Sequence, residues 1–248
     1  MDNELEAEDR GQKIVDLYEK LTSMPEYKVL EKIKSLEMSK YVFQSNYSDL
    51  NKLLTARVDV NKIRGLREAD RRLQKTATLF EITRLLHNFV ASVQSFIQHT
   101  RILYREIYRK TEIFPEYQSE LERRFTKSPL VQFVEDLRDY CLHFQAPPVC
   151  SSLYWSQINA VYNTGVKLDT NELSKYSKWS PAGKKYLANQ SNPIDLLSVV
   201  DEYYALVMDF CNWFQSRQKE IHSAEIARIN ALEEEIQSLL KQEYSRSQ

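Results

Sequence analysis

Three side chains in the segment Arg138-Asp139-Tyr140-Cys141-Leu142-His143 are of the types needed to cleave RNA without a metal ion. Histidine has an unperturbed pKa of about 6.5, so His143 can take a proton from a ribose 2′-hydroxyl, or return one, near neutral pH. Arg138 stays charged and offers a forked set of donors to phosphate oxygens, which stabilises charge in the transition state. Asp139 lies one turn before His143 and can fix the imidazole tautomer by a hydrogen bond. Arg138, His143 and Asp139 are therefore the candidate catalytic residues.

The sequence around this motif predicts a short amphipathic helix. Ser128 can cap free backbone N–H groups and Pro129 suits the first helical position, while Gln145-Ala146-Pro147-Pro148 predicts the end of the helix. With about 100° between successive residues, the apolar residues gather on one side that is expected to face a core. They are Phe133, Val134, Leu137, Tyr140, Cys141 and Phe144.

The two catalytic candidates fall on opposite flanks of that apolar stripe. The spacing of Arg138 and His143 places them about 140° apart around the helix, too far apart to meet one substrate on an isolated helix. They converge more easily where two copies of this face meet across a twofold axis, and Leu142 on the polar side would suit such an interface. The spacing therefore favours a homodimer.

The run R-D-Y-C-L-H resembles the signature of the HEPN superfamily, in which an Arg and a polar residue are followed by a His after a short fixed gap. The segment also resembles uncharacterised bacterial helical proteins in which L-R-x-Y-x-x-H precedes a proline-terminated turn. The resemblance covers the motif and, loosely, the helices from about 66 to 148. It implies a small helical bundle with the motif on a late helix, and paired protomers that form a cleft for metal-independent RNA cleavage.

Carried over residue by residue, the resemblance gives each member of the motif a role. Arg138 would bind phosphate and stabilise its charge, His143 would be the general acid and base, and Asp139 would be the polar helper. Asp139 stands where the family commonly has Asn, and its charge would repel a phosphate unless it is paired. The implied function is a metal-independent endoribonuclease, a toxin or defence component, whose partners would be RNA, a second copy of the chain and an antitoxin or regulatory protein.

A structural reading of the same residues stays open. Arg138 can pair with Glu135 or a neighbouring acid, and His143 can lie near a helix end, where a cation is favoured. The protein would then be a non-catalytic helical interaction or scaffold protein that retains the motif for folding or dimerisation. A net charge of −1 favours this alternative slightly, because no global basic field attracts nucleic acid and any RNA site must be local.

Other side chains give weaker signals. Six basic residues at or near one-turn spacing could contact a phosphate backbone, although a solvated charged face is the more common reason for such a pattern. They are Arg101, Arg105, Arg109, Arg123, Arg124 and Lys127. His87 and His99 lie beside an apolar stripe, and His222 is expected at the surface. The spacing of the His and Cys residues predicts no metal site, and no cofactor-binding motif is present in the sequence.

Composition predicts a mainly α-helical protein. Four glycines and seven prolines among 248 residues favour long helices over many turns, and 42% hydrophobic residues allow a substantial core. No apolar run approaches a membrane span, so no membrane partner is expected. Three widely spaced cysteines do not form a disulfide framework, and Cys141 and Cys211 are expected to be small buried residues. These features favour a cytoplasmic protein.

Hydrophobic periodicity predicts a helical bundle around one very long central helix, with a small β-hairpin insertion after the motif helix. The central helix is expected from Leu66 to about Lys110, because its apolar positions alternate steps of three and four residues. Two helices are expected before it, at about 11–22 and 26–56, the second with a possible break near Glu37 and followed by a connector at 56–65. A short helix containing Tyr117, Leu121 and Phe125 is expected before the motif helix.

The pattern changes after the motif helix. Short strands are expected at Leu153-Tyr154-Trp155, at Ala160-Val161-Tyr162 and at Val166-Lys167-Leu168, with Asn163-Thr164-Gly165 between the last two. Helices are expected to start at Ser180-Pro181 and at Asn192-Pro193. A thin apolar stripe of Ile229, Leu232, Ile236 and Leu239 either packs back on the bundle or pairs with a second copy. The predicted organisation is a disordered tail at 1–10, a HEPN-like bundle at 11–148, a hairpin and irregular insertion at 149–190, and C-terminal helices at 191–248.

Overall fold

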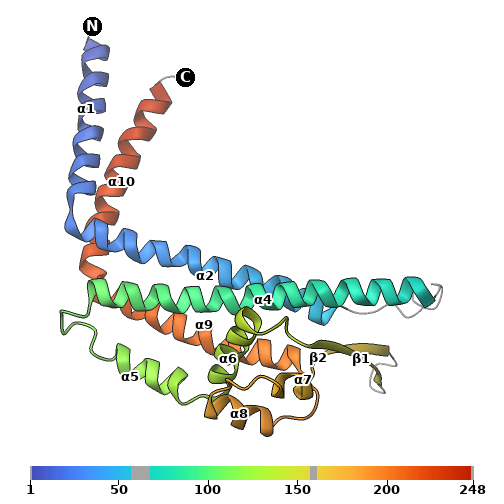
Figure 1. Ribbon diagram of the computed structural model, residues 1–248. Coiled ribbons are helices and arrows are strands. Elements are labelled where there is room, and N and C mark those ends of the chain that lie inside the picture. Colours follow the sequence, from blue (N-terminus) through green and yellow to red (C-terminus); the bar gives the residue numbers. More distant parts are fainter. Residues whose placement is uncertain (1, 57–67, 157–160, 247–248) are drawn as a thin grey trace. The chain divides into compact units, whose positions relative to one another are not determined.

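The computed structural model describes residues 2–56, 68–156 and 161–246, and these are mainly helical with one small antiparallel sheet (Figure 1). This confirms the predicted fold class. The expected connector at 56–65 lies almost wholly outside the described residues. In chain order the elements are α1 (Asp2–Ser23), α2 (Pro25–Thr55), α4 (Glu68–Ile107), α5 (Tyr117–Leu121), the π-helix η1 (Glu122–Thr126), α6 (Pro129–His143), β1 (Val149–Ser156), β2 (Val161–Leu168), α7 (Thr170–Ser174), α8 (Pro181–Ala188), β3 (Ile194–Asp195), α9 (Leu196–Ile221) and α10 (Ser223–Arg246).

The chain divides into two compact units. The first unit is formed by the residues up to Glu37, by Ile102–Phe114 and by the residues from Asn212 onward. The second unit is formed by Met38–Arg101 and Pro115–Cys211. Three of the four unit boundaries fall within α2, α4 and α9, and the fourth lies between α4 and α5; none coincides with the divisions at 148 and 190 that the sequence pattern suggests.

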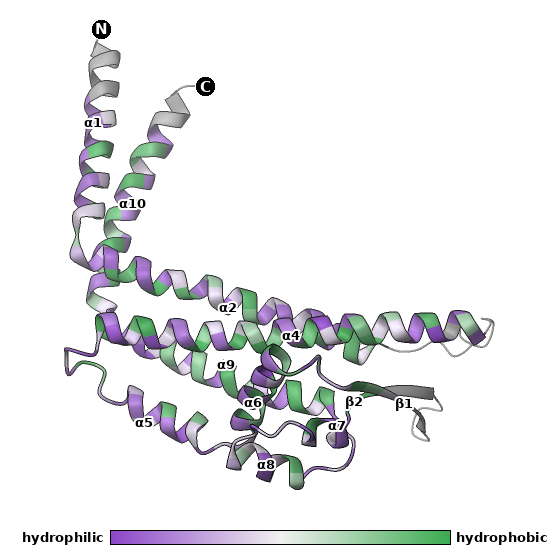
Figure 2. Ribbon diagram, in the orientation of Figure 1, coloured by the Kyte–Doolittle hydropathy of each residue, from purple (hydrophilic) through white to green (hydrophobic). Residues whose placement is uncertain are grey.

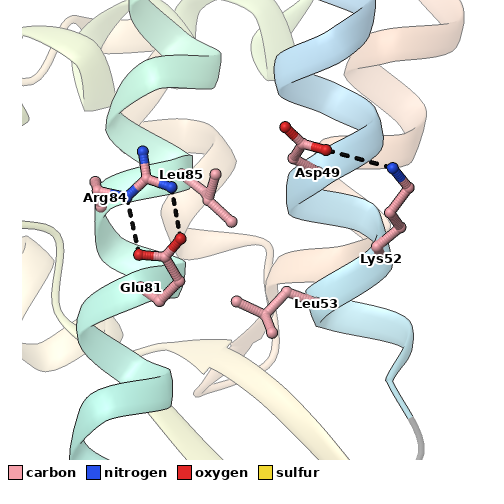
Figure 3. Close-up of a pocket in the computed structure, with 6 residues that line it drawn as sticks. All are labelled: Asp49, Lys52, Leu53, Glu81, Arg84 and Leu85. Atoms are coloured by element: carbon pink, nitrogen blue, oxygen red, sulfur yellow. Dashed lines mark hydrogen bonds and ion pairs between the residues drawn. The ribbon is translucent and has the colours of Figure 1, made fainter.

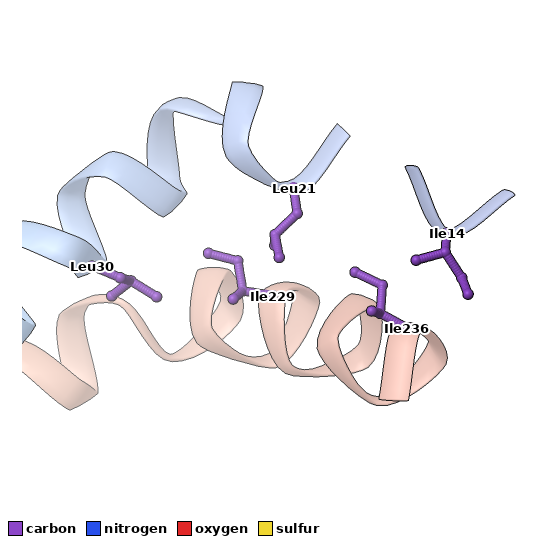
Figure 4. Packing of buried hydrophobic residues seen from close by; sticks show 5 residues of the cluster. All are labelled: Ile14, Leu21, Leu30, Ile229 and Ile236. Atoms are coloured by element: carbon purple, nitrogen blue, oxygen red, sulfur yellow. The ribbon is translucent and has the colours of Figure 1, made fainter. Parts of the chain in front are cut away.

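In the first unit the C-terminal helix packs against the N-terminal helices of the same chain (Figure 4). Ile229 and Ile236 of α10 are buried with Ile14 and Leu21 of α1 and Leu30 of α2, and Leu232 and Leu239 pack around them. The thin stripe of α10 is therefore covered within the chain, which decides between the two alternatives left open by its sequence. Its partner α1 begins at Asp2, inside the segment where a disordered tail is expected.

His222 lies between α9 and α10 and is buried, so the prediction of a surface position is wrong. Its Nε2 atom is 3.0 Å from the hydroxyl of Tyr108, which is fully buried. Burial lowers the pKa of His222, while the nearby Glu225 opposes this shift. Burial also raises the pKa of the Tyr108 hydroxyl to about 12. The neutral imidazole thus completes a buried polar contact at the junction of two helices.

In the second unit α4 packs against α2 through aromatic side chains. Phe43 of α2 lies 5.6 Å from Phe89 and 6.1 Å from Phe96, measured between ring centroids, and all three are fully buried. Tyr203 of α9 meets Phe89 edge-on at 6.3 Å. A long helix is present where the sequence predicts one, with described bounds at Glu68 and Ile107, and α2 runs through Glu37 without a break.

The helix that carries the motif has the predicted start and a close partner in α8. The Ser128 side chain accepts a hydrogen bond from the Val131 backbone N–H at 3.4 Å, and Pro129 is the first helical residue. Phe133 stacks between Trp179 and Tyr186, with centroid distances of 5.5 and 4.7 Å. This stacking buries the apolar face of α6 and fixes which of its residues face solvent.

A carboxylate of α6 also organises the start of α8. Asp136 accepts hydrogen bonds from the Ser180 backbone N–H at 2.8 Å and from the Ser180 hydroxyl at 2.7 Å. The Ser180 hydroxyl in turn accepts a hydrogen bond from the Gly183 N–H, which makes it the N-cap of α8, as its sequence predicts. A Cβ atom at Gly183 would overlap with Oδ2 of Asp136, so this close approach requires glycine.

The predicted hairpin is present, but its turn is not at the expected position. Asn163, Thr164 and Gly165 lie within β2, where they pair with Tyr154, Leu153 and Ser152 of β1. The glycine and asparagine therefore belong to a continuous strand, which their turn propensity does not reveal. A third strand, β3, pairs antiparallel with the end of β2, and α9 begins at Leu196 rather than directly after Asn192-Pro193.

Replacing Gly183 with alanine is expected to lower the free energy of unfolding by about 1–2 kcal/mol. The added Cβ displaces Asp136 from a charge-assisted hydrogen-bond pair, and this loss exceeds the gain in helix propensity. Gly11→Ala is the matched control, because nothing lies within 4 Å of a Cβ there and alanine is expected to stabilise α1 slightly. Urea denaturation measures both effects, and a stabilised Gly183→Ala variant would contradict the described contact.

The buried His222 is expected to make the protein less stable as the pH falls below about 6.5. Its pKa is lowered in the folded state. The unfolded chain therefore binds the proton first, and protonation favours unfolding. Melting temperatures of the wild type and of His222→Gln, measured between pH 8 and pH 5, test this, since carboxylate titration is common to both proteins. Parallel curves for the two proteins would contradict the assignment.

Candidate functional site

Arg138 lies on α6 beside a carboxylate of its own helix. Its Nη1 atom is 3.5 Å from Oδ1 of Asp139, and the Arg138 side chain is 30% exposed. The guanidinium is thus accessible to solvent and is paired with a neighbouring acid, as the structural reading of the motif predicts. An exposed pair of this length is worth at most about 1 kcal/mol and can exchange with another anion.

His143 is the last residue of α6 and is exposed. Within the described part of the chain Asp139 makes no hydrogen bond with His143; it pairs with Arg138 instead. The structure therefore brings Arg138 and Asp139 together, and it does not bring either of them to His143. A single copy of α6 presents the guanidinium and the imidazole as separate groups on one exposed side of the helix.

Two apolar side chains border this exposed side of α6. Leu142 is 43% exposed, as its position on the polar side of the helix predicts. Phe144 is 48% exposed, so the prediction that it faces the core is wrong. The reason is local: Phe144 follows the last helical residue and has φ −124° and ψ −68°, which breaks the helical spacing. Its ring lies against Tyr140 and Tyr176 at 5.2 and 5.3 Å.

Carboxylates, more than cations, surround the motif. Burial raises the pKa of Glu135, and the charge of Arg101 from α4 opposes that shift. Asp136 and Asp139 add to the rise, so the three acids of α6 influence one another. Asp136 is committed to Ser180 and Asp139 to Arg138. A phosphate that binds Arg138 must therefore displace Asp139 or approach the guanidinium from the side that faces away from Asp139.

The six weaker RNA-binding candidates do not form one surface within a single unit. Arg105 and Arg109 belong to the first unit, and the other four belong to the second. Arg123 and Arg124 both donate to Glu120, whose pKa they lower to about 2, and Arg124 also pairs with Asp209. Arg101, Arg105, Arg109 and Lys127 are exposed. Two of the candidates are thus engaged in ion pairs, with Arg124 only 11% exposed.

A pocket of about 310 Å³ lies between α2 and α4, away from the residues singled out by the sequence (Figure 3). Its apolar lining consists of Leu53 and Leu85. Its charged lining consists of the ion pairs Lys52–Asp49 at 3.4 Å and Arg84–Glu81 at 2.5 Å. The residues come from two helices far apart in sequence, so no local motif signals the pocket.

The described residues contain neither three clustered His, Cys, Asp or Glu side chains that could hold a metal ion nor a helix long and apolar enough to cross a membrane. All three cysteines are free thiols. Cys211 is buried, as expected, and burial raises the pKa of the Cys141 thiol to about 12, so neither is poised as a nucleophile.

Comparisons of the chain with protein-family models, with curated proteins and with solved structures find no match. The ground for the HEPN expectation is therefore the motif itself. Arg138 and His143 are both accessible to solvent. Because one helix does not bring them together, a site that uses both needs a second group of residues.

Arg138→Ala is expected to change the free energy of unfolding by no more than about 1 kcal/mol, because its pair with Asp139 is partly exposed and long. Arg124→Ala is the matched comparison and is expected to cost about 2 kcal/mol or more, because its guanidinium is nearly buried between two carboxylates. Denaturant titration of both variants measures the difference. A loss at Arg138 as large as that at Arg124 would mean that Arg138 is mainly structural.

Proposed function

We propose that this protein is a metal-independent endoribonuclease of HEPN type that acts in a cleft completed by a second copy of the chain. The observation that carries the proposal is that Arg138 and His143, on one short helix, both reach solvent. The proposal further assigns it a role as a toxin or defence component in the cytoplasm, with RNA as substrate and an antitoxin or regulatory protein as a partner.

The chemistry follows from the two side chains. His143 of one copy takes the proton of a ribose 2′-hydroxyl, and the 2′-oxygen forms a new bond to phosphorus. The bond from phosphorus to the 5′-oxygen breaks, and the leaving oxygen takes a proton from the second copy's imidazole. Arg138 leaves Asp139 and binds the phosphate oxygens as their negative charge builds. The products carry a 2′,3′-cyclic phosphate and a 5′-hydroxyl.

A second copy is part of this proposal because one helix does not bring the two groups together. Arg138 and His143 lie about 140° apart around α6, so the partner's α6 must supply the missing group. Leu142 lies between them and is exposed, which suits burial against the same residue of the partner. The Arg138–Asp139 pair is weak, so the guanidinium can exchange Asp139 for a phosphate.

A second candidate function is a non-catalytic helical interaction protein. The observation that favours it is the Arg138–Asp139 pair, because this contact uses the motif arginine within its own helix. The acids Glu135, Asp136 and Asp139 on the same helix also disfavour the approach of a polyanion. In this function the motif shapes the surface of α6 and performs no chemistry.

Cleavage of a labelled RNA in the presence of a chelator distinguishes the two functions. The nuclease proposal expects chelator-resistant cleavage by the wild type, and a loss of at least about 100-fold in rate for His143→Ala, the contribution typical of a general acid or base. His99→Ala is the matched control, since His99 is also exposed but lies outside the motif, where it contacts Ser39. Both variants are expected to melt at the wild-type temperature.

Arg138→Lys adds a second readout. Lysine keeps the charge and loses the fork, so cleavage is expected to fall while binding of RNA persists. Equal cleavage by the wild type and His143→Ala would contradict the nuclease proposal. Absence of cleavage by a folded, dimeric wild type on structured and unstructured RNA would favour the interaction protein.

A further inference from the structure

The N-terminal part of α4 exposes large apolar side chains to solvent. Leu73 and Phe80 are each 71% exposed, and every side chain from Arg72 to Thr78 is exposed. Figure 2 shows hydrophobic positions recurring along this stretch of α4 among hydrophilic ones. Exposing two such residues one heptad apart is unfavourable in water, so the helix has an apolar stripe that a partner can cover.

This stripe has a negatively charged residue, Asp70, at one end and a positively charged residue, Arg84, at the other. With about 100° per residue, Asp70, Leu73, Ala77, Phe80 and Arg84 fall within an arc of about 80°. Asp70 lies seven residues before Ala77 and Arg84 lies seven residues after it. Both charged side chains are exposed. Lys75 lies on the opposite face, where its charge acts on Cys150 of β1, so the apolar stripe points away from that strand.

We propose that this stripe is a self-association surface, on which α4 of a second copy binds in antiparallel orientation about a twofold axis at Ala77. This arrangement places Asp70 opposite the partner's Arg84, and Arg84 opposite the partner's Asp70. Leu73 then packs against the partner's Phe80 on each side of the axis. The apolar side chains are covered and both ends are closed by ion pairs, which makes the surface complementary to itself.

The charges also exclude the parallel orientation. A parallel pair in register places Asp70 beside the partner's Asp70 and Arg84 beside the partner's Arg84, which is repulsive at both ends. In the antiparallel pair Glu81 lies near the partner's Gln74, and the opposite flank carries the uncharged Thr76 and Thr83. The partner's Asp70 joins Arg84 beside Glu81, so each guanidinium bridges two carboxylates. Arg84 keeps its hydrogen bonds to Glu81, at 2.5 and 2.8 Å, and it also borders the pocket of Figure 3.

This contact is distinct from the cleft invoked for RNA cleavage. Arg101, which acts on Glu135 of α6, lies 24 residues after Ala77, or about 36 Å along a helix that rises 1.5 Å per residue. A twofold axis at Ala77 therefore does not by itself bring two motifs together. The proposal of a self-association surface does not depend on the nuclease proposal.

Charge reversal at the two ends of the stripe tests the proposal in the full-length chain. To remove the separate contact proposed at α6, the measurements are made in a Leu142→Glu background, which is expected to dimerise in sedimentation equilibrium over a concentration series. Asp70→Arg alone and Arg84→Asp alone are each expected to raise the dimer dissociation constant by at least about tenfold, because each creates two like-charge contacts. An equimolar mixture of the two variants is expected to form a heterodimer as tight as the dimer of the Leu142→Glu background, since every contact is then between opposite charges.

Two matched controls carry the same charge changes on the opposite face. Glu68→Arg and Lys75→Asp are expected to leave the dissociation constant unchanged. Phe80→Ser is expected to weaken the dimer at least tenfold without lowering the melting temperature, because the ring is exposed in the monomer. Leu142→Glu addresses the separate contact at α6 and is expected to leave the α4 contact intact.

The association state of the wild type, of the variants and of their mixture decides whether the α4 stripe is a self-association surface. A Leu142→Glu protein that stays monomeric at every concentration overturns the proposal. A dimer that is insensitive to Asp70→Arg and Phe80→Ser, or that dissociates with Leu142→Glu alone, also overturns it. Loss of the dimer in both charge variants without restoration in their mixture overturns the antiparallel pairing.

Discussion

The second unit depends on burial of one face of α4. Phe89 and Phe96 pack on Phe43 of α2, and Tyr203 of α9 closes the same cluster. These side chains are large and fully buried, so each contributes several times the free energy of a surface contact. Once this face of α4 is covered by α2 and α9, the remaining elements of the unit must pack against the faces of these helices that are still exposed.

The same constraint acts on the motif helix. Phe133 of α6 stacks between Trp179 and Tyr186, and Asp136 holds the start of α8 through Ser180. These contacts fix the rotation of α6 about its own axis. Leu142 and His143 are exposed as a consequence, and Arg138 is partly exposed. Their accessibility thus follows from the packing of other residues, and it would arise whether or not the exposed side performs chemistry.

The local electrostatics of α6 place a limit on any anion-binding role. A guanidinium beside a carboxylate 3.5 Å away is nearly neutral at long range, and it becomes a phosphate ligand only when that carboxylate is displaced. A second copy of the chain would change this balance, because it can bring an imidazole and remove water from the same surface. In the proposed nuclease, catalysis by this motif would therefore be coupled to assembly, whereas an interaction role for the same surface would not.

The sequence by itself determined the features that depend on neighbours along the chain. The caps at Ser128 and Ser180, the long periodic run of α4 and the apolar stripe of α6 all follow from local hydrogen bonding and a 3.6-residue repeat. The type and spacing of Arg138 and His143 were likewise visible, as was the exposure of Leu142. Phe144 was misplaced because one non-helical residue at the end of α6 breaks that repeat.

Only the tertiary structure decided which faces meet. Four features depend on a rotamer or on a packing partner that periodicity does not specify. They are the burial of His222 beside Tyr108, the packing of α1 on the α10 stripe, the position of Asn163-Thr164-Gly165 inside β2, and the pairing of Arg138 with Asp139. The exposure of the apolar stripe of α4 also depends on tertiary packing. Its apolar residues continue the repeat that is buried farther along the helix, and the sequence pattern is the same in both places. The difference is whether another element packs against that part of the helix, which depends on the whole chain.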